Sequence, residues 1–232
     1  MLFDSRAAGQ SCCLMRHPRT ALIVILLAAG LSHPAAGQLA SRSADEWIKT
    51  LESPGRVADL RIDEVIGRLG LKPGDVVADL GAGAGVFSVP LARAVGPTGK
   101  VYAVEIDQAL VDHISRKASD QKAGNVRAIL GTFTDPALPS ADVDVAFFHD
   151  VVHHIEDRPG YLKQVTRYLK PAGRFAIVEL DAETGAHRND PKLQITKDQL
   201  KSWLADLGFV QTAEYPLGPA KWYVVYSRTK PS

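Results

Sequence analysis

Short apolar runs alternate with amphipathic stretches along most of the chain. Five of these runs have the length and composition of buried strands; they span residues 76–80, 101–106, 126–130, 143–148 and 175–180. Between them, apolar positions recur every three or four residues, a spacing that predicts helices. Near-continuous apolar strands separated by helices indicate a parallel sheet that is covered by helices on both faces.

Two further strands are predicted near the end of the chain, at 209–215 and 222–227. The loop between them, 216–219, is short and rich in proline and glycine. A parallel pair needs a long crossover connection, so we expect these two strands to be antiparallel. We therefore predict a doubly wound, Rossmann-like α/β fold of three layers (α/β/α), with a seven-stranded sheet that is mostly parallel and whose last strand is antiparallel.

Two helices are expected before the first strand. Ser43 and Glu46 have the spacing of a capping box, which predicts a short helix beginning there. A second helix is predicted from Ser53–Pro54 up to Gly70. We expect residues 38–72 to form a helical extension that acts as a lid, and residues 73–232 to form the main domain.

The first 37 residues have the pattern of a secretory signal. Arg16 and Arg19 precede an apolar run at 21–31, and small residues follow up to Gly37. A membrane-spanning helix needs about 20 apolar residues, so this run is short for one. We predict a signal peptide or an N-terminal anchor, with translation starting at Met1 or at Met15. The protein would then be exported to the periplasm or associated with a membrane through residues 21–31, and cytoplasmic if this segment is not used.

Composition excludes several classes of protein. Hydrophobic residues make up 46% and charged residues 23%, which is typical of a globular chain. The net charge of +1 gives no reason to expect nucleic acid as a partner. The two cysteines are Cys12 and Cys13, so neither a disulfide framework nor a cysteine-based metal site is expected beyond residue 13.

A glycine-rich segment follows the first predicted strand. Residues 79–85 match D-x-G-x-G-x-G, and such glycines let a backbone turn tightly and approach a ligand closely. The next helix would direct its N-terminal amides at the same space. The dinucleotide pattern G-x-G-x-x-G is not matched, because its sixth position is occupied by Val86 or Ser88.

Acidic residues stand at the end of the second predicted strand. Glu105 follows the glycine-rich segment by about twenty residues, and a carboxylate at that place can accept hydrogen bonds from both ribose hydroxyls of an adenosine. Asp107 is the competing candidate for this role.

Polar side chains also crowd the end of the fourth predicted strand. His149 and Asp150 follow it directly, at the edge of the sheet that faces the ligand crevice in open α/β folds. His149 is a candidate general base that Asp150 would orient; alternatively, both only hold the cofactor. We expect His153 and His154 to cap the segment. A metal site from these histidines with Glu179 is a minor alternative, and no metal site is predicted.

The segment 76–107, VVADLGAGAGVFSVPLARAVGPTGKVYAVEID, resembles the first two motifs of the class I S-adenosylmethionine-dependent methyltransferases. Segments 142–155 and 169–180 resemble the fourth and fifth strands of that family. The resemblance covers about residues 55 to 228 and is strongest to the branch that methylates small molecules, quinones and lipids. It implies S-adenosylmethionine as cofactor and in-line transfer of its methyl group to a small-molecule acceptor.

The resemblance also implies roles for individual residues. The glycine-rich loop would hold the methionine part of the cofactor and Glu105 the ribose. The turn after the third strand would supply the adenine pocket, but the family's Gly-Asp pair is replaced by Gly131-Thr132, with Asp135 displaced. The predicted catalytic residues are His149 and Asp150. The predicted cofactor-binding residues are Asp79, Gly81, Ala82, Gly83, Gly85, Glu105, Ile106, Thr132, Phe133 and His149.

Two other functions stay open on the sequence. One is a cofactor-binding protein without catalysis, because an exported protein would meet no obvious supply of S-adenosylmethionine. The other is an NAD(P)-dependent oxidoreductase, which Val86 and the antiparallel C-terminal strands disfavour. The identity of the acceptor and the oligomeric state do not follow from the sequence.

Overall fold

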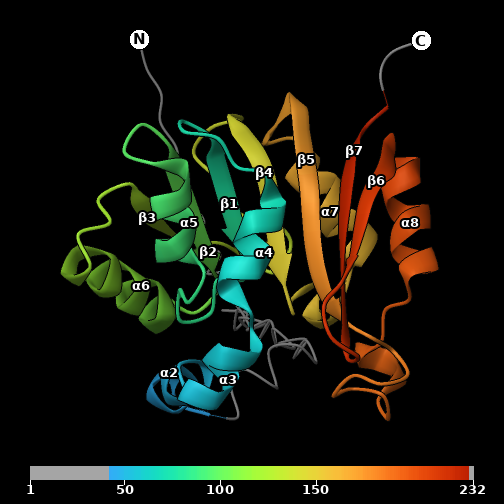
Figure 1. Cartoon of the computed structure of the whole chain (residues 1–232), viewed down its shortest axis with the longest axis horizontal. Coiled ribbons are helices and arrows are strands. Elements are labelled where there is room, and N and C mark those ends of the chain that lie inside the picture. The colour runs from blue at the N-terminus through green and yellow to red at the C-terminus, as the bar shows by residue number, and fades with distance from the viewer. Residues whose placement is uncertain (1–41, 230–232) are drawn as a thin grey trace, which may run out of the picture. The chain divides into compact units, whose positions relative to one another are not determined.

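The computed structural model describes residues 42–229, and the predicted signal segment lies outside them. The apolar runs form one seven-stranded sheet (Figure 1). Its strands are β1 (Val76–Leu80), β2 (Lys100–Glu105), β3 (Val126–Leu130), β4 (Val143–His149), β5 (Leu169–Leu180), β6 (Phe209–Pro216) and β7 (Lys221–Arg228). Their order in the sheet is β3-β2-β1-β4-β5-β7-β6.

The direction of the strands follows the connections between them. Strands β1 to β5 are mutually parallel, whereas β7 lies antiparallel between β5 and β6. This confirms the predicted topology. It also places the first residue of β7, Lys221, beside the last residue of β5, Leu180.

Strand β5 begins earlier than predicted. The strand was predicted at 175–180, yet it already pairs Leu169 with Val143 and then continues through an irregularity between Val143 and Val145. Gly173 lies at this irregularity. A Cβ atom there would come within 2.9 Å of two carbonyl oxygens, so only glycine lets the two strands approach so closely.

Helices cover both faces of the sheet. Residues of α4, α5 and α6 share one hydrophobic cluster with Val77 and Val145, whereas residues of α7 and α8 share the other with Ala78 and Phe148. The predicted three-layer arrangement is therefore confirmed. The helices are α2 (Ala44–Leu51), α3 (Pro54–Asp59), α4 (Ile62–Leu69), α5 (Ser88–Val95), α6 (Gln108–Asp120), α7 (Arg158–Thr166) and α8 (Lys197–Asp206), with 3-10 turns η1 (Val152–His154) and η2 (Pro191–Leu193).

The single helix predicted from Ser53 to Gly70 is wrong, because the chain forms two helices there. Arg61 adopts a left-handed conformation, with φ 51°, between α3 and α4. Helix α4 buries Val65 and Leu69 against the sheet, whereas α3 buries none of its residues. The break lets α4 cover the sheet while α2 and α3 lie at one end of it (Figure 1).

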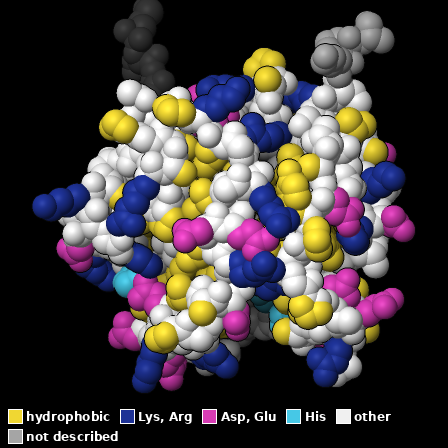
Figure 2. Space-filling model, in the orientation of Figure 1, with side chains coloured by type: hydrophobic (Ala, Val, Ile, Leu, Met, Phe, Trp, Pro, Cys, Tyr) yellow, Lys and Arg dark blue, Asp and Glu magenta, His cyan; other side chains and the backbone are white. Residues whose placement is uncertain are grey.

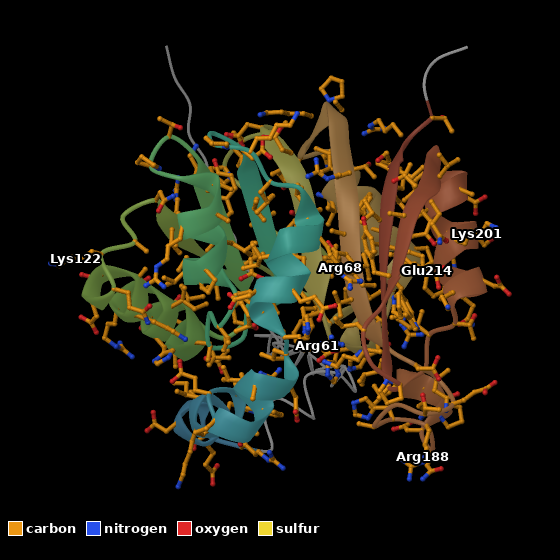
Figure 3. The ribbon with its side chains drawn as sticks, in the orientation of Figure 1. Arg61, Arg68, Lys122, Arg188, Lys201 and Glu214 are labelled. Atoms are coloured by element: carbon orange, nitrogen blue, oxygen red, sulfur yellow. The ribbon has the colours of Figure 1, made fainter. Side chains whose placement is uncertain are left out.

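Charged side chains occupy the outer surfaces. Arg61 and Arg68 both pair with Glu64 on the outer side of α4, each at 2.5 Å. Figure 2 shows charges of both signs mixed over this face, and Lys122, Arg188 and Lys201 are labelled at the margins of the molecule in Figure 3. Within residues 42–229, none of the helices is long and apolar enough to cross a membrane.

Candidate active site

A cavity of about 750 Å³ lies at the carboxyl edge of the parallel strands, where α2 and α3 face the ends of β1, β2 and β4. Its volume is in the range of small-molecule and cofactor sites, about 300–1,000 Å³. Nearly all predicted site residues line it. These are Asp79, Gly81, Ala82, Gly83, Glu105, Ile106, Thr132, Phe133, His149 and Asp150.

The glycine-rich loop needs its glycines for two different reasons. Gly81, Gly83 and Gly85 have φ values of 71°, 57° and 67°, a left-handed backbone that other residues rarely adopt. A Cβ at Gly81 would also lie 2.6 Å from the methyl groups of Val151. Gly85 is not among the residues that line the cavity, and its free side faces Ile114 of α6 instead.

Glu105 holds this loop from the end of β2. Its carboxylate accepts hydrogen bonds from the backbone N–H of Gly83 at 2.9 Å and from that of Ile106 at 2.8 Å. Burial raises the pKa of Glu105, and these two N–H groups partly offset the effect. Because an ionised carboxylate has about four acceptor positions, this one can still accept bonds from ligand hydroxyls.

Asp79 is a second buried carboxyl group beside the loop. The hydroxyl of Ser88, at the start of α5, donates to it at 2.6 Å. Burial raises the pKa of Asp79 to about 7, the Ser88 bond opposes the shift, and the nearby Glu105 adds to it. A ligand with positive charge at this end of the cavity would favour the ionised form of both carboxyl groups, so the wall suits a cation.

The turn after β3 decides which side chain can face a bound base. Thr132 and Phe133 line the cavity, whereas Asp135 does not. The Asp135 carboxylate is held elsewhere, because it accepts from the Tyr168 hydroxyl at 2.7 Å, from the Ala137 N–H at 2.8 Å and from Gln164. The displaced Asp135 is therefore a structural residue of this turn.

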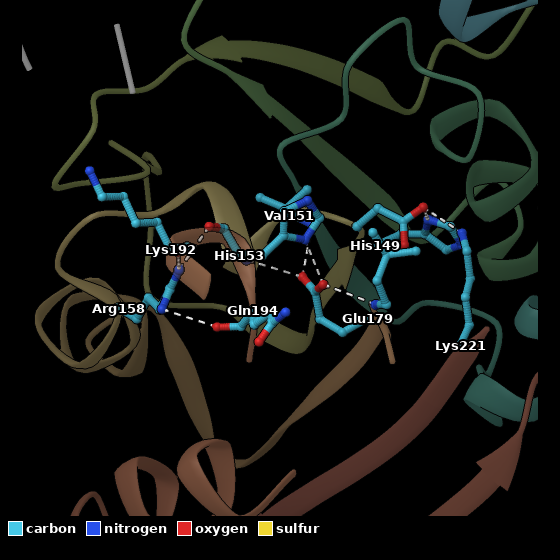
Figure 4. A network of polar contacts seen from close by, with 10 residues as sticks. His149, Val151, His153, Arg158, Glu179, Lys192, Gln194 and Lys221 are labelled. Atoms are coloured by element: carbon cyan, nitrogen blue, oxygen red, sulfur yellow. Dashed lines mark hydrogen bonds and ion pairs between the residues drawn. The ribbon is translucent and has the colours of Figure 1, made fainter. Parts of the chain in front are cut away.

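His149 and Asp150 meet Lys221, which was not among the predicted site residues. The Nζ of Lys221 donates to Asp150 Oδ2, and the same oxygen lies 3.4 Å from His149 Nδ1 (Figure 4). The ring of His149 packs 4.6 Å from that of Phe87. Among the described residues, His149 Nε2 and Asp150 Oδ1 are buried without a hydrogen-bond partner.

These contacts set the charge of the pair. Burial would raise the pKa of Asp150, but the His149 ring and the Lys221 charge outweigh it and hold this pKa below its ordinary value. Burial lowers the pKa of His149. At neutral pH the group is thus a neutral imidazole beside an ionised Asp150. The carboxylate favours the proton on Nδ1 and leaves the Nε2 lone pair free.

Lys221 could have been found from the predicted topology. A last strand that runs antiparallel to its neighbour starts at the edge where the parallel strands end, and Lys221 is its first residue. His187, which also lines the cavity, lies in the loop after β5, where no pattern in the sequence points to it.

Helix α2 is attached to the site through α6. Glu52, which follows α2, accepts from Lys117 Nζ at 2.7 Å and lies 2.9 Å from His113 Nε2. Lys117 also donates to the carbonyl oxygen of Ala84 in the glycine-rich loop, at 3.1 Å. A Cβ at Gly83 would meet Leu51 at 3.1 Å, so α2 covers the loop directly.

Comparison with known proteins agrees with this geometry. A family model described as "Methyltransferase domain" matches residues 71–209. The chain is 31% identical over 106 residues to the nocamycin O-methyltransferase of Saccharothrix syringae, and this match covers 46% of this chain and 38% of that protein. It is also 31% identical over 111 residues to the 2-phytyl-1,4-naphtoquinone methyltransferase of Trichormus variabilis, covering 47% and 48%.

A solved structure extends the match. A SAM-dependent methyltransferase from Aquifex aeolicus superposes with a TM-score of 0.73 at 25% identity, over 81% of this chain and all of that one. By contrast, the chain spans less than half of the curated relatives that it matches: 38% of the nocamycin O-methyltransferase and 48% of the naphtoquinone methyltransferase.

Proposed function

The chain belongs to the methyltransferase-domain family, and on that premise we propose that it transfers a methyl group from S-adenosylmethionine to a small-molecule acceptor. The observation that carries the proposal is that the Glu105 carboxylate accepts a hydrogen bond from the Gly83 N–H of the glycine-rich loop, and that both residues line the same cavity. An adenosyl cofactor requires a carboxylate at the end of a strand and a glycine-rich backbone that the cofactor can approach closely.

The described residues fit this cofactor. Glu105 would accept from the ribose hydroxyls, Thr132 and Phe133 would face the adenine, and the loop with Asp79 would face the methionine part. The bound cofactor supplies an electrophilic methyl group on a positively charged sulfonium. The buried carboxylates of Asp79 and Glu105 favour such a cation, and a cavity of about 750 Å³ holds both the cofactor and a small acceptor.

The acceptor end is formed by His149, Asp150 and Lys221. Lys221 keeps Asp150 ionised, and Asp150 faces Nδ1 of His149, which leaves the buried and unpartnered Nε2 as the nitrogen available as a base. We propose that Nε2 takes a proton from a hydroxyl or amine of the acceptor. Apolar side chains on the same walls, among them Leu51 and Phe87, exclude water and suit an acceptor with apolar parts.

Kinetics distinguish a base from a residue that only binds the cofactor. If Nε2 is the base, His149→Ala lowers kcat by about 10²–10⁴-fold with little change in cofactor affinity. If His149 only binds, the cofactor Kd rises and kcat falls little. No change in either quantity would mean that His149 is structural.

Cofactor binding is tested by calorimetry with S-adenosylmethionine, S-adenosylhomocysteine and NAD. We expect the two sulfur compounds to bind and NAD not to. Glu105→Ala should weaken S-adenosylhomocysteine binding by about 1–3 kcal/mol, because buried hydroxyls lose their acceptor.

The matched control is Glu64→Ala, since Glu64 pairs with two arginines on the outer side of α4 and does not line the cavity. Equal affinity in the two variants, or tight binding of NAD alone, contradicts the proposal.

We also propose that α2 and α3 form the lid that the sequence predicted. Leu51 over Gly83, and the link from Glu52 to α6, place this short segment against the cofactor loop. Export or membrane attachment through residues 21–31 stays a prediction. The mass of the mature N-terminus, together with cell fractionation, tests it.

A further inference from the structure

Three imidazoles meet on the wall of the cavity. His153 and His154 belong to η1, and His187 comes from the loop between β5 and η2. Their ring centroids lie 4.1 Å (His153 to His154), 5.0 Å (His153 to His187) and 6.0 Å (His154 to His187) apart. One nitrogen of each ring lies within 4.8 Å of the chosen nitrogens of the others. One nitrogen of each ring is therefore close enough to the other two for a single ion to contact all three.

Glu179 determines which nitrogen His153 presents. The Nδ1 of His153 lies 2.6 Å from Glu179 Oε2, and both side chains are almost fully buried, at 2% and 1% exposed (Figure 4). Glu179 also accepts backbone N–H bonds from Val151 at 3.0 Å, His153 at 3.3 Å and Leu180 at 3.2 Å. With the proton on Nδ1, the ring donates to this carboxylate, and Nε2 is then the nitrogen that can offer a lone pair to a ligand.

This arrangement is the one found behind metal-binding histidines. A ligating imidazole almost always donates its other ring N–H to a carboxylate or carbonyl, which fixes its tautomer and raises its basicity. Without an ion between them, three neighbouring imidazoles only disfavour each other's protonation. Besides accepting the backbone N–H bonds of this turn, the Glu179 carboxylate orients one of the three imidazoles, as the outer partner of a metal-binding histidine does.

The loop that brings His187 is tied to the turn that brings the other two. Arg158 donates to the carbonyl oxygen of His153 at 2.9 Å and to that of Lys192 at 2.6 Å. Gln194 donates to the carbonyl oxygens of Arg188 at 2.7 Å and His187 at 3.4 Å. The three rings are thus held by a hydrogen-bonded frame, and the Arg158 guanidinium is directed at carbonyl groups.

We propose that His153, His154 and His187 bind one divalent transition-metal ion, with Glu179 as the buried partner that orients His153. Imidazole ligands suit zinc, iron, copper and nickel. Zinc–nitrogen bonds of about 2.0–2.1 Å in a tetrahedron place the ligand nitrogens about 3.4 Å apart, so the three nitrogens need to draw together by about 1.4 Å at most. Three protein ligands leave a fourth position, and all three histidines line the cavity.

The open position suggests what the ion does, and this part rests on the proposed methyl transfer. A metal-bound water or hydroxyl loses its proton at lower pH than a free one. An acceptor with a hydroxyl group, bound through its oxygen, would release that proton to His149 Nε2 or to solvent. The open position therefore favours hydroxyl acceptors, and one with a second oxygen nearby can chelate the ion when the site expands to five ligands, as zinc sites do.

Metal binding is tested on the full chain carrying Cys12→Ser and Cys13→Ser, which removes both thiols. After treatment with EDTA, Co²⁺ is titrated and followed by its visible absorption, and Zn²⁺ by calorimetry. We expect one ion to bind, and His187→Ala and His154→Ala each to weaken binding by at least about tenfold. His154 is exposed and His187 half-buried, so neither replacement removes a core residue.

The matched control is His113→Ala, a histidine of α6 that pairs with Glu52 and lies outside the cluster. It should bind the metals as the parent does. No binding by the parent, or equal binding by all variants, overturns the proposal. Calorimetry with S-adenosylhomocysteine is run on every variant: its binding confirms that the variant is folded. Metal binding without any S-adenosylhomocysteine binding in the parent would leave the metal site standing and refute the methyl transfer.

The acceptor role has its own probe, 2,3-dihydroxybenzoate. If the fourth position is open to acceptors, adding it to the Co²⁺-loaded parent shifts the visible absorption, and the shift is absent in His187→Ala. A Co²⁺ spectrum that does not respond to the probe refutes the acceptor role.

Discussion

Replacing Lys221 with methionine tests the charge arrangement at the acceptor end. Lys221 and Asp150 are both mostly buried, at 17% and 18% exposed, and the Lys221 ammonium donates directly to the carboxylate. Lys221→Met keeps an apolar stem of similar length and removes the ammonium. Asp150 then keeps the His149 ring, whose Nδ1 lies 3.4 Å away, and the electrostatic attraction of Arg56.

The magnitude follows from general electrostatics. Opposite unit charges about 4 Å apart attract by about 4 kcal/mol at an effective dielectric constant of about 20. Removing one partner of a fully buried pair costs about 3–5 kcal/mol, because the other charge stays buried. Both side chains here keep some access to solvent, so we expect Lys221→Met to lower the free energy of unfolding by about 2–3 kcal/mol at pH 7.

The pH dependence carries a definite sign. A depressed folded-state pKa means that the contribution of Asp150 is present above its unfolded value, near 3.9, and is lost as pH falls through the folded value. Without Lys221, burial raises the pKa of Asp150, and His149 loses a neighbouring positive charge that lowers its own pKa. Protonation of Asp150 removes its buried charge, and protonation of His149 supplies a new positive partner. The loss of unfolding free energy caused by Lys221→Met should therefore become smaller as pH falls from about 7 to 4.

Urea unfolding at pH 7, 5.5 and 4 measures this cost. The matched control is Lys197→Met, whose ion pair with Glu214 is exposed, at 46% and 41%, and should change stability by less than about 1 kcal/mol. The double variant Lys221→Met, Asp150→Asn should recover part of the loss at pH 7. An equal loss in both lysine variants, or a Lys221→Met cost that does not change with pH, would refute the reasoning.

Two further predictions concern the cofactor wall and the lid. Asp79 has a folded-state pKa raised to about 7, so between about pH 4 and 7 the folded state binds a proton that the unfolded state has lost. The free energy of unfolding should therefore fall by on the order of 4 kcal/mol as pH rises over this range. Urea unfolding should show this dependence on pH in the parent and a much smaller one in Asp79→Asn, and equal dependence in both would contradict the prediction. Deleting residues 43–52 should spare folding, because α2 buries none of its residues, and spare S-adenosylhomocysteine binding while lowering turnover; unchanged turnover would exclude a lid.

Much of the fold was predictable from local pattern. Residues 76–80 are apolar without interruption and form a strand buried along its whole length. The short 216–219 loop required antiparallel neighbours, and β6 and β7 are antiparallel. These features depend on contacts between residues close in the chain, or on a length limit that any chain must obey, so the amino-acid order is enough to determine them.

The break at Arg61 and the early start of β5 were not predictable in the same way. The 54–69 segment has helical periodicity throughout, and only the packing of α4 on the sheet separates it from α3. Residues 170–173 have turn composition, yet pairing with Val143 draws Leu169 into the strand. In both cases contacts with distant segments outweigh a local preference of about 1 kcal/mol or less per residue.

The residues of the site also fall into those that the sequence could predict and those that only the tertiary structure brings together. The sequence by itself determined Asp79, the glycine-rich loop and Glu105, because backbone conformation and position at a strand end are local properties. Only the tertiary structure decided that Glu105 holds Gly83, that Lys221 holds Asp150, and that His187 joins His153 and His154. Lys221 is 71 residues from Asp150 and His187 is 34 residues from His153, and side-chain contacts across such separations are set by how strands and loops pack, which no spacing rule in the sequence encodes.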